Sequence, residues 1–235
     1  MTSTNTPIII GVCGGTSCGK TSVAKEIQTR LQHQLLKKSK GNNTLNTTLN
    51  IVLLSQDNSY KTLSPSEIQQ AFNSEYNFDH PNAQDHDLFF KWLSEIKNGS
   101  SVKIPVYDFV THSHSGTVPD IVVEKCDVLI VEGLLLFYYN EIRDLLDFKI
   151  FVDVADDERL ARRIERDTRY RGRDTSTVLA EWRKYAQPGF LQFIFPTKEY
   201  ADIIVPRGGK NIQAIDMITT HLIDMLINNN DDDYL

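Results

Sequence analysis

The sequence predicts an α/β fold with a mainly parallel sheet that is flanked by helices. Five short apolar segments, at residues 8–13, 50–55, 127–133, 148–153 and 201–206, have the length and composition of buried strands. Helical patterns lie between them, and strands that alternate with helices are typical of a parallel sheet. Two other features add to this fold. A pair of proline-containing strands predicts a small β-hairpin, and an arginine-rich segment predicts a helical lid over the carboxyl edge of the sheet.

The composition is that of an ordinary globular protein, with 40% apolar and 24% charged residues in a chain of 235. We expect a single domain over residues 1–227 and a disordered acidic tail at 228–235. The net charge of −6 argues against general affinity for nucleic acid or for an anionic membrane. Three irregularly spaced cysteines, no secretory signal and no apolar stretch of membrane-spanning length predict a cytoplasmic protein.

The first apolar strand leads directly into residues 14–21, whose sequence GGTSCGKT fits the P-loop pattern G-x-x-x-x-G-K-S/T. Such a loop directs backbone N–H groups and a helix N-terminus at phosphate oxygens. Lys20 would reach the terminal phosphates, and the hydroxyl of Thr21 would hold Mg²⁺. Because a chain of this length matches by chance on the order of one time in a hundred, we predict a nucleoside triphosphate site. Its expected residues are Gly14, Gly15, Thr16, Ser17, Cys18, Gly19, Lys20, Thr21 and Ser22.

Asp57 follows the second strand, after a helix predicted at about 20–38 and a polar, Asn- and Thr-rich loop predicted at 39–50. Ligands gather at the carboxyl ends of parallel strands. We expect the second strand to lie beside the strand of the P-loop, so that Asp57 faces the phosphates. The alternative is an aspartate that caps a turn or a helix.

Residues 64–67 are Ser-Pro-Ser-Glu, a capping box with proline at the first helical position, and they predict a short helix. The irregular stretch 76–81 then places Phe78 beside Asp79, a pair that suits contact with a sugar or a base. A buried phenylalanine and a helix-capping aspartate would explain the same residues without a ligand. A further helix is expected at 85–97, where the pattern is amphipathic and Asn98-Gly99 ends it.

Residues 102–124 contain two strand-like runs, at 102–107 and 118–123, and each run includes a proline. Because proline has no backbone N–H to pair, these runs predict an edge hairpin outside the main sheet that could fold over a substrate. His112 and His114 lie between the runs. Two histidines without a cysteine or carboxylate at ligand spacing are a weak metal signal, and we do not expect a metal there.

Glu132 lies at the end of the buried strand at 127–133. In P-loop proteins a carboxylate at the end of a neighbouring strand orders the Mg²⁺ shell. A buried strand has no room for an unpaired charge, so a purely structural role is the weaker alternative. We therefore expect Glu132 to face Mg²⁺.

Residues 159–173 hold seven arginines against two acidic residues, in a chain whose net charge is negative. A solvated helix face is the usual origin of a charge run, but arginine in place of lysine favours bidentate recognition of anions. We expect residues 159–175 to form the lid. RNA binding is the alternative, and the scarcity of aromatics in the tract and the acidic remainder of the chain disfavour it. Further helices are predicted at 176–185 and 212–227.

The order and spacing of these motifs resemble those of the uridine–cytidine kinase family, from about residue 8 to about residue 227. Beyond the P-loop, the segments that carry the resemblance are SQD at 55–57, YNFDHP at 76–81, PVYDFVTH at 105–112, VEG at 131–133, RGRD at 171–174 and PTKEYAD at 196–202. The resemblance implies phosphorylation of uridine or cytidine at the 5′-hydroxyl, with ATP or GTP as donor. It also implies Mg²⁺, a homotetramer and inhibition by UTP and CTP.

The same resemblance implies roles for single residues. Asp57 would be the general base, with Lys20 at the transferring phosphoryl group and Mg²⁺ near Thr21, Glu132 and Asp57. The ribose would be held by Asp79 and Arg173, and the base would be read by Tyr107 and His112. Phe78, Phe109 and Phe137 would line the base pocket, Arg163, Arg166 and Arg171 would handle phosphates or the sugar, and Glu181 would lie at the ribose.

Two positions depart from the family pattern. Glu181-Trp182 stands where relatives commonly have Gln-Tyr, and His114 stands where they commonly have arginine. An ionised glutamate only accepts hydrogen bonds, and a histidine makes the hairpin charge pH-dependent.

Three other functions compete with the nucleoside kinase. A related kinase of a phosphosugar or a coenzyme precursor, such as phosphoribulokinase, would share the P-loop, Asp57 and the lid but would not need the hairpin with His112. A GTPase would need an Asn-Lys-x-Asp motif, which the sequence lacks. A non-catalytic nucleotide-binding module would be expected to have lost Asp57 or Lys20.

Overall fold

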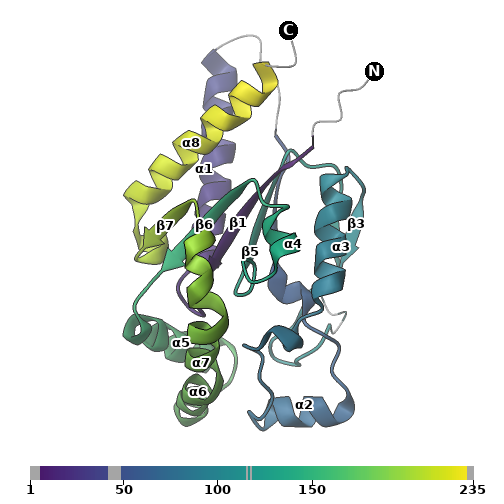
Figure 1. The fold of residues 1–235 in the computed structure, drawn as a ribbon, viewed down its shortest axis with the longest axis vertical. Coiled ribbons are helices and arrows are strands. Elements are labelled where there is room, and N and C mark those ends of the chain that lie inside the picture. Colours follow the sequence, from purple (N-terminus) through teal and green to yellow (C-terminus); the bar gives the residue numbers. More distant parts are fainter. Residues whose placement is uncertain (1–5, 42–48, 115, 117, 232–235) are drawn as a thin grey trace.

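The computed structural model describes residues 6–41, 49–114, 116 and 118–231. At its centre is a sheet of five strands in the order β2–β5–β1–β6–β7 (Figure 1). Every neighbouring pair in this sheet is parallel, so the α/β class and all five predicted strands are confirmed. The strands are β1 (Ile8–Gly14), β2 (Ile51–Ser55), β5 (Val128–Gly133), β6 (Phe148–Asp153) and β7 (Ile203–Pro206).

Helices cover both faces of the sheet. In β5, Leu129 and Val131 belong to one hydrophobic core and Val128 and Ile130 to the other, as the two-residue period of a strand requires. Each core is closed by a pair of helices. These are α3 (His86–Lys97) and α4 (Asn140–Arg143) on one face, and α1 (Lys20–Gly41) and α8 (Ile212–Asp231) on the other.

The order of the strands corrects one expectation. β5 lies between β1 and β2, so the strand that precedes Asp57 is not the neighbour of the P-loop strand. In the paired register Ser55 lies opposite Glu132, and Glu132 lies opposite Val12. The carboxyl ends of all three strands still meet at one edge of the sheet, with Glu132 in the middle.

Two helices extend beyond their predicted ends. α1 continues to Gly41, into the loop predicted at 39–50, and α8 continues to Asp231, into the tail predicted at 228–235. Extending an existing helix costs far less than starting one, so polar residues of modest helix propensity can add a turn. The remainder of both predicted segments, residues 42–48 and 232–235, lies outside the described residues.

The hairpin forms, and it is shorter than predicted. β3 (Val102–Ile104) and β4 (Ile121–Val123) pair antiparallel in a sheet of their own. Pro105 follows β3 directly and Pro119 lies two residues before β4, so the prolines limit the ladder. The loop between the strands continues toward the carboxyl edge of the main sheet, where Asp108 and Ser113 form a bridge.

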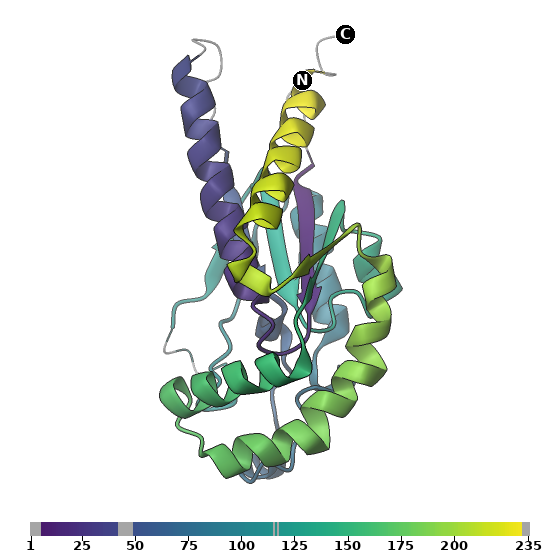
Figure 2. The same cartoon turned by 90° about the vertical axis from the view of Figure 1, so that its left-hand side faces the viewer.

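The lid region consists of α5 (Asp156–Tyr170) and a long bent helix that follows it. In Figure 2, α5 and the start of the bent helix lie beneath the carboxyl edge of the sheet, and the bent helix then rises along one side of it. The predicted helix at 176–185 is longer in the structure, because wide π-turns at 182–186 and 190–194 continue it on both sides of Pro188. Proline has no N–H to donate, and wider turns accommodate such a gap. Its regular parts are α6 (Thr175–Glu181) and α7 (Gln187–Gly189).

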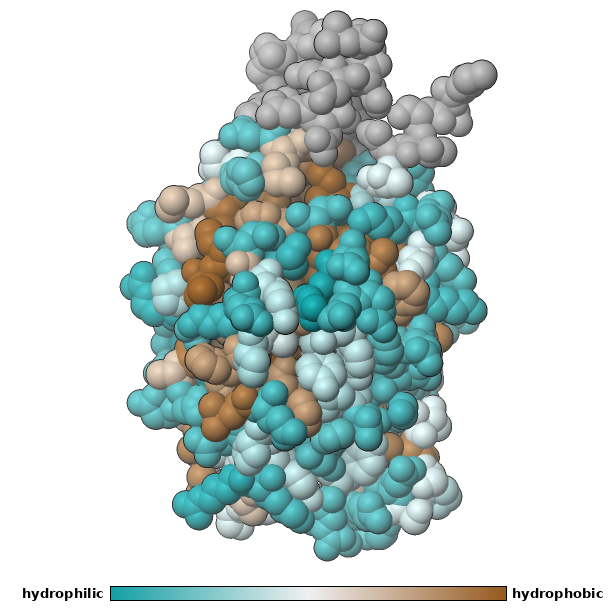
Figure 3. Space-filling view, viewed as in Figure 1, coloured by the Kyte–Doolittle hydropathy of each residue, from teal (hydrophilic) through white to brown (hydrophobic). Residues whose placement is uncertain are grey.

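Below the sheet, α2 (Pro65–Phe72) begins with the predicted capping box, in which Ser64 and Glu67 exchange side-chain and backbone hydrogen bonds. The face drawn in Figure 3 is mainly hydrophilic, with hydrophobic residues in separate patches. Within the described ranges, we find no helix with the length and apolar character needed to cross a membrane.

Candidate active site

The P-loop connects the end of β1 to the start of α1. Gly14 and Gly19 adopt φ angles of 149° and 96°, a region that favours glycine. A Cβ on Gly14 would lie 2.9 Å from the Cys18 sulfur, so the loop is also closely packed. Lys20 is buried, and its Nζ donates to the carbonyl of Gly15 at 3.1 Å. The loop is thus closed around its lysine.

Six of the predicted phosphate-binding residues line one large cavity of about 890 Å³. Gly14, Gly15 and Cys18 do not line the cavity and lie inside the loop. Burial raises the pKa of the Cys18 thiol, so the thiol acts as a small packing group. The residues at the cavity surface are Thr16, Ser17, Gly19, Lys20, Thr21 and Ser22.

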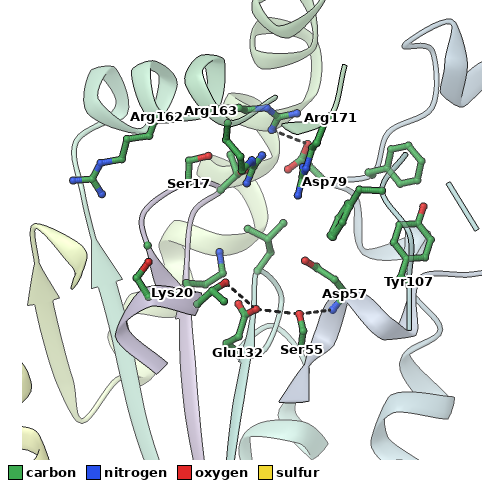
Figure 4. Close-up of a pocket in the computed structure, with 18 of the residues that line it drawn as sticks. Ser17, Lys20, Ser55, Asp57, Asp79, Tyr107, Glu132, Arg162, Arg163 and Arg171 are labelled. Atoms are coloured by element: carbon green, nitrogen blue, oxygen red, sulfur yellow. Dashed lines mark hydrogen bonds and ion pairs between the residues drawn. The ribbon is translucent and has the colours of Figure 1, made fainter. Parts of the chain in front are cut away.

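A run of hydrogen bonds crosses the strand ends from the P-loop to Asp57. The hydroxyls of Thr21 and Ser55 both donate to Oε1 of Glu132, at 3.1 and 3.0 Å. The backbone N–H of Asp57 in turn donates to the Ser55 hydroxyl at 3.3 Å (Figure 4). The structure therefore brings Thr21, Glu132 and Asp57 together, and Ser55 is the link that the sequence analysis did not name.

Mg²⁺ fits this set of donors. The ion binds through one or two carboxylates together with substrate phosphates and water, so it needs few protein ligands. Thr21 and Glu132 supply a hydroxyl and a carboxylate beside Lys20. Among the described residues, His, Cys, Asp and Glu side chains form no group of three or more that could hold a metal by themselves.

Asp57 lies in a short helical turn at Gln56–Ser59 and lines the cavity opposite Lys20. Burial raises its pKa to about 6, and the nearby Glu132 carboxylate adds to the increase. Lys20, Arg171 and Arg166 oppose the shift. A carboxylate with a pKa near the working pH can take a proton and release it again, which is the property of a general base.

Aromatic rings and His112 form one wall of the cavity. Phe78 and His112 are stacked, with ring centroids 5.0 Å apart and an interplanar angle of 15°. Tyr107 lies between Tyr60 and Phe109, at 4.9 and 5.4 Å. Burial lowers the pKa of His112, with Arg173 adding to the decrease, so the imidazole is neutral at pH 7. The wall offers stacking faces and a neutral polar edge, which suit a flat heterocycle.

Asn58 fixes this wall to the strand end. Its side-chain oxygen accepts from the backbone N–H of Tyr107 at 3.1 Å, and its carbonyl oxygen accepts from Nε2 of His114 at 2.9 Å. A carbonyl cannot donate, so His114 carries its proton on Nε2. The Tyr107 hydroxyl is buried without a hydrogen-bond partner among the described residues. It is therefore available to a ligand.

The opposite wall is made of charged residues. Glu181 accepts from Arg163 at 3.2 Å and from Arg173 at 2.6 Å. Asp79 lies 3.9 Å from Arg163, and burial raises the pKa of Asp79 although that arginine opposes the shift. Figure 4 shows Arg163, Arg171 and Asp79 on one side of the cavity, facing Lys20, Glu132 and Asp57. Arg166 also lines the cavity.

Phe137 does not reach the cavity. Its side chain is fully buried in the core between the sheet and helices α3 and α4, close to Gly11 of β1. The chain turns at the end of β5, and it is Leu134 that lines the cavity from this segment. The expectation that Phe137 lines a base pocket is therefore not supported by its position.

Several lining residues were not singled out from the sequence. Arg162 donates to the carbonyl of Cys18 at 3.3 Å, and Lys210 lies 3.4 Å from Glu158, so both are placed near the outer side of the P-loop. The pair Gly208-Gly209, one residue after β7, was the available signal for this part, because glycines let a backbone approach a ligand. The others are Glu26, Ser55, Tyr60, Tyr76, Leu134, Tyr185 and Gly209.

Comparisons with known proteins identify the family of this chain. The sequence model of the phosphoribulokinase/uridine kinase family matches residues 9–214. Uridine-cytidine kinase 2-B of Danio rerio is 42% identical over 220 residues, which cover 94% of this chain and 80% of that protein. Uridine-cytidine kinase A of Dictyostelium discoideum is 45% identical over 216 residues, covering 92% of this chain. A chloroplastic uridine/cytidine kinase of Arabidopsis thaliana is 42% identical over a similar span. The chain covers only 39% and 41% of the latter two proteins.

Solved structures share the fold at low sequence identity. A Silicibacter protein named as a fructose transport system kinase has a TM-score of 0.61 and 18% identity, covering 88% of this chain and 93% of that chain. D-glycerate 3-kinase of Cryptococcus neoformans has a TM-score of 0.56 and 16% identity, covering 86% of each chain. At such identities the likeness concerns the fold alone. Because the family model spans most of its length, this chain belongs to the phosphoribulokinase/uridine kinase family.

Proposed function

We propose that this protein is a uridine–cytidine kinase, which transfers the γ-phosphoryl group of ATP or GTP to the 5′-hydroxyl of uridine or cytidine. The observation that carries the proposal is the joining of three elements in one cavity: the P-loop, the buried carboxylate Asp57 and an aromatic wall with neutral His112. A triphosphate fits the first element and a pyrimidine the last. Asp57 lies between them, where the hydroxyl would react.

The reaction needs positioning and charge stabilisation more than covalent chemistry. Lys20 leaves the Gly15 carbonyl and binds the β- and γ-phosphates. Asp57 accepts the hydrogen bond of the 5′-hydroxyl and takes its proton as the new bond forms. Arg166 and Arg171, which lower the pKa of Asp57 by their charge, also stabilise the phosphoryl oxygens. Thr21 and Glu132 would hold Mg²⁺, which would neutralise negative charge on the phosphates.

The acceptor side favours a neutral nucleoside over a phosphosugar. Arg163 and Arg173 are already paired with Glu181, so they are not free to bind a second phosphate. The aromatic wall would have no partner in a phosphosugar. Asp79 and Glu181 present carboxylate oxygens that accept hydrogen bonds from ribose hydroxyls.

A coupled assay of ADP release tests the proposal. Uridine and cytidine should support turnover, and thymidine, adenosine and ribulose 5-phosphate should support much less. Turnover with ribulose 5-phosphate alone would replace the proposal with a phosphosugar kinase, and no turnover with any acceptor would remove the kinase function. The same assay with GTP measures the donor preference.

We propose a homotetramer in the cytoplasm, as the resemblance implies. Exposed side chains such as Leu191, Phe195 and Tyr200 provide apolar surface for contact between copies. Light scattering coupled to size-exclusion chromatography measures the mass, and a monomer at micromolar concentration would contradict the tetramer.

A further inference from the structure

Asp167 is a buried carboxylate that none of the roles above uses. It lies on α5, one turn before the end of the helix, and its side chain is fully buried. It does not line the cavity but lies behind the arginines that do. Buried carboxylates are expensive unless they are paired, so such a residue needs an explanation.

Its side chain pairs with three arginines of the lid. Oδ1 accepts from Nε of Arg166 at 2.7 Å and lies 3.4 Å from Nη1 of Arg171. Oδ2 lies 3.4 Å from Nε of Arg163. All three arginines also line the cavity. One carboxylate therefore lies within 3.4 Å of all three guanidinium groups and accepts a hydrogen bond from that of Arg166.

The backbone of Asp167 holds the next part of the lid. Its carbonyl oxygen accepts from the N–H of Arg171 at 3.3 Å and from the N–H of Arg173 at 3.1 Å. These bonds close the last turn of α5 and start the segment that leads to α6. Side chain and backbone together connect Asp167 to four arginines of the cavity wall.

The arginines would repel one another without this anion. Burial lowers the pKa of Arg171 to about 10, and the charge of Arg166 adds to the decrease. Burial would also raise the pKa of Asp167, but the hydrogen bond and charge of Arg166, with Arg171 and Arg163, hold that pKa below its usual range. Asp167 is thus ionised at neutral pH. It offsets part of the positive charge where the arginines converge on Asp57 and Asp79.

We propose that Asp167 is a positioning residue for phosphoryl transfer: it sets the directions in which Arg163, Arg166 and Arg171 enter the cavity. The inference rests on the proposed kinase function. It does not require Asp167 to touch a substrate. The arginine charges remain when Asp167 is neutralised, so ground-state binding of phosphates persists. Alignment with the transferring group is lost.

The test is Asp167→Asn, which keeps the shape of the side chain and removes its charge. We expect kcat for uridine to fall about 100-fold, as a misplacement of about 1 Å can cause. KM for ATP should change less than about threefold, because that binding depends on charges that remain. Any ATP hydrolysis without an acceptor should fall as well, since it would depend on Arg166 and Arg171 at the phosphoryl oxygens.

The matched control is Glu165→Gln on the same helix. Glu165 pairs with Arg169 at 2.7 Å, but both side chains are more than half exposed. This variant removes the same charge from α5 and should keep kcat within about twofold. An Asp167→Asn protein with normal kcat per folded molecule and only a lower Tm would reduce Asp167 to a structural residue.

Two further measurements keep the result interpretable. If the Asn variant does not fold, Asp167→Glu keeps the charge and lengthens the side chain by one methylene. Positioning then predicts a folded protein with lowered kcat, and an unchanged kcat would overturn it.

A wild-type protein that hydrolyses ATP but phosphorylates no nucleoside would refute the proposed function. In that case the ATP hydrolysis rates of the variants would still test Asp167.

Discussion

The two sides of the cavity hold their functional groups by different means. On the P-loop side, Lys20 and Thr21 begin α1 where the P-loop ends, and Glu132 lies in β5, so backbone geometry places them. On the lid side, Glu181 of α6 pairs with Arg163 of α5 and with Arg173 of the segment between the two helices. The first side is built into the sheet. The second side depends on charged side chains that meet from different helices.

This difference predicts different responses to substitution and to salt. A group fixed by backbone geometry leaves a local gap when it is removed, and its neighbours stay in place. A group held in an ion-pair network changes the charge balance of its partners when it is removed. Screening by salt acts on exposed pairs more than on buried ones, and of the two Glu181 pairs only the one with Arg173 has a partly exposed partner.

The largest effect is expected at Lys20. Lys20→Ala removes the buried cation that faces the transferring phosphoryl group, and kcat should fall by about 10³-fold or more. Lys25→Ala on the exposed face of the same helix is the control and should be near normal. Steady-state ADP release measures both. Near-normal turnover of the Lys20 variant would contradict phosphoryl transfer at the P-loop.

Asp57→Asn should cost about 10²- to 10⁴-fold in kcat, the usual contribution of a general base. Asparagine caps turns about as well as aspartate, so the fold and uridine binding should persist. Isothermal calorimetry and turnover on the same preparation separate the two. Turnover within a few-fold of wild type would leave Asp57 with a structural role only.

The pH dependence sharpens this prediction. The pKa of Asp57 is raised to about 6, so kcat/KM of the wild type should fall as pH drops through about 6. The same shift means that the folded protein binds the proton more tightly than the unfolded chain does. The resulting stability is present below the unfolded pKa and is lost as pH rises through 6. The Asp57→Asn variant should therefore lack this fall in kcat/KM at acidic pH, and it should lose no stability at pH 8.

A smaller effect is expected at the base pocket. His112→Ala removes a neutral polar edge and a stacking partner of Phe78, and KM for uridine and cytidine should rise by about 10- to 100-fold. His112→Phe keeps a ring and removes the polar edge, so it separates stacking from hydrogen bonding. If both variants keep wild-type constants for uridine, the hairpin does not read the base.

The parts predicted well from the sequence are those set by local chain geometry. The P-loop and Glu132 each belong to one strand and the residues that follow it, so a short stretch of sequence specifies them. The capping box at Ser64 is another local case, and it forms as predicted. Glycine and proline positions restrict the backbone directly.

The errors concern contacts between distant segments. The neighbour of β1 is β5 rather than β2, because sheet order depends on how whole strands pack and no single strand encodes it. Phe137 follows the functional strand closely, yet its ring turns into the core because Gly11 leaves space there. In the sequence, Asp167 is only one of the two acidic residues of the arginine-rich segment. Its importance depends on the helical spacing that gathers Arg163 and Arg171 around it.

The smallest effect is expected at Glu181, the position that departs from the family pattern. Glu181→Gln keeps one acceptor oxygen and removes the charge that compensates Arg163 and Arg173. The two arginines can then bind an anion more readily, so inhibition by the product UMP should tighten by a few-fold while kcat changes less than about threefold. Glu95→Gln on α3, where the pair with Lys91 is exposed, is the control and should leave the inhibition constant unchanged. The gain in UMP affinity should shrink with added salt, because it arises from charge. An unchanged inhibition constant at low salt would mean that Glu181 does not restrain these arginines. The arrangement of the lid would then not depend on the Glu181 ion pairs.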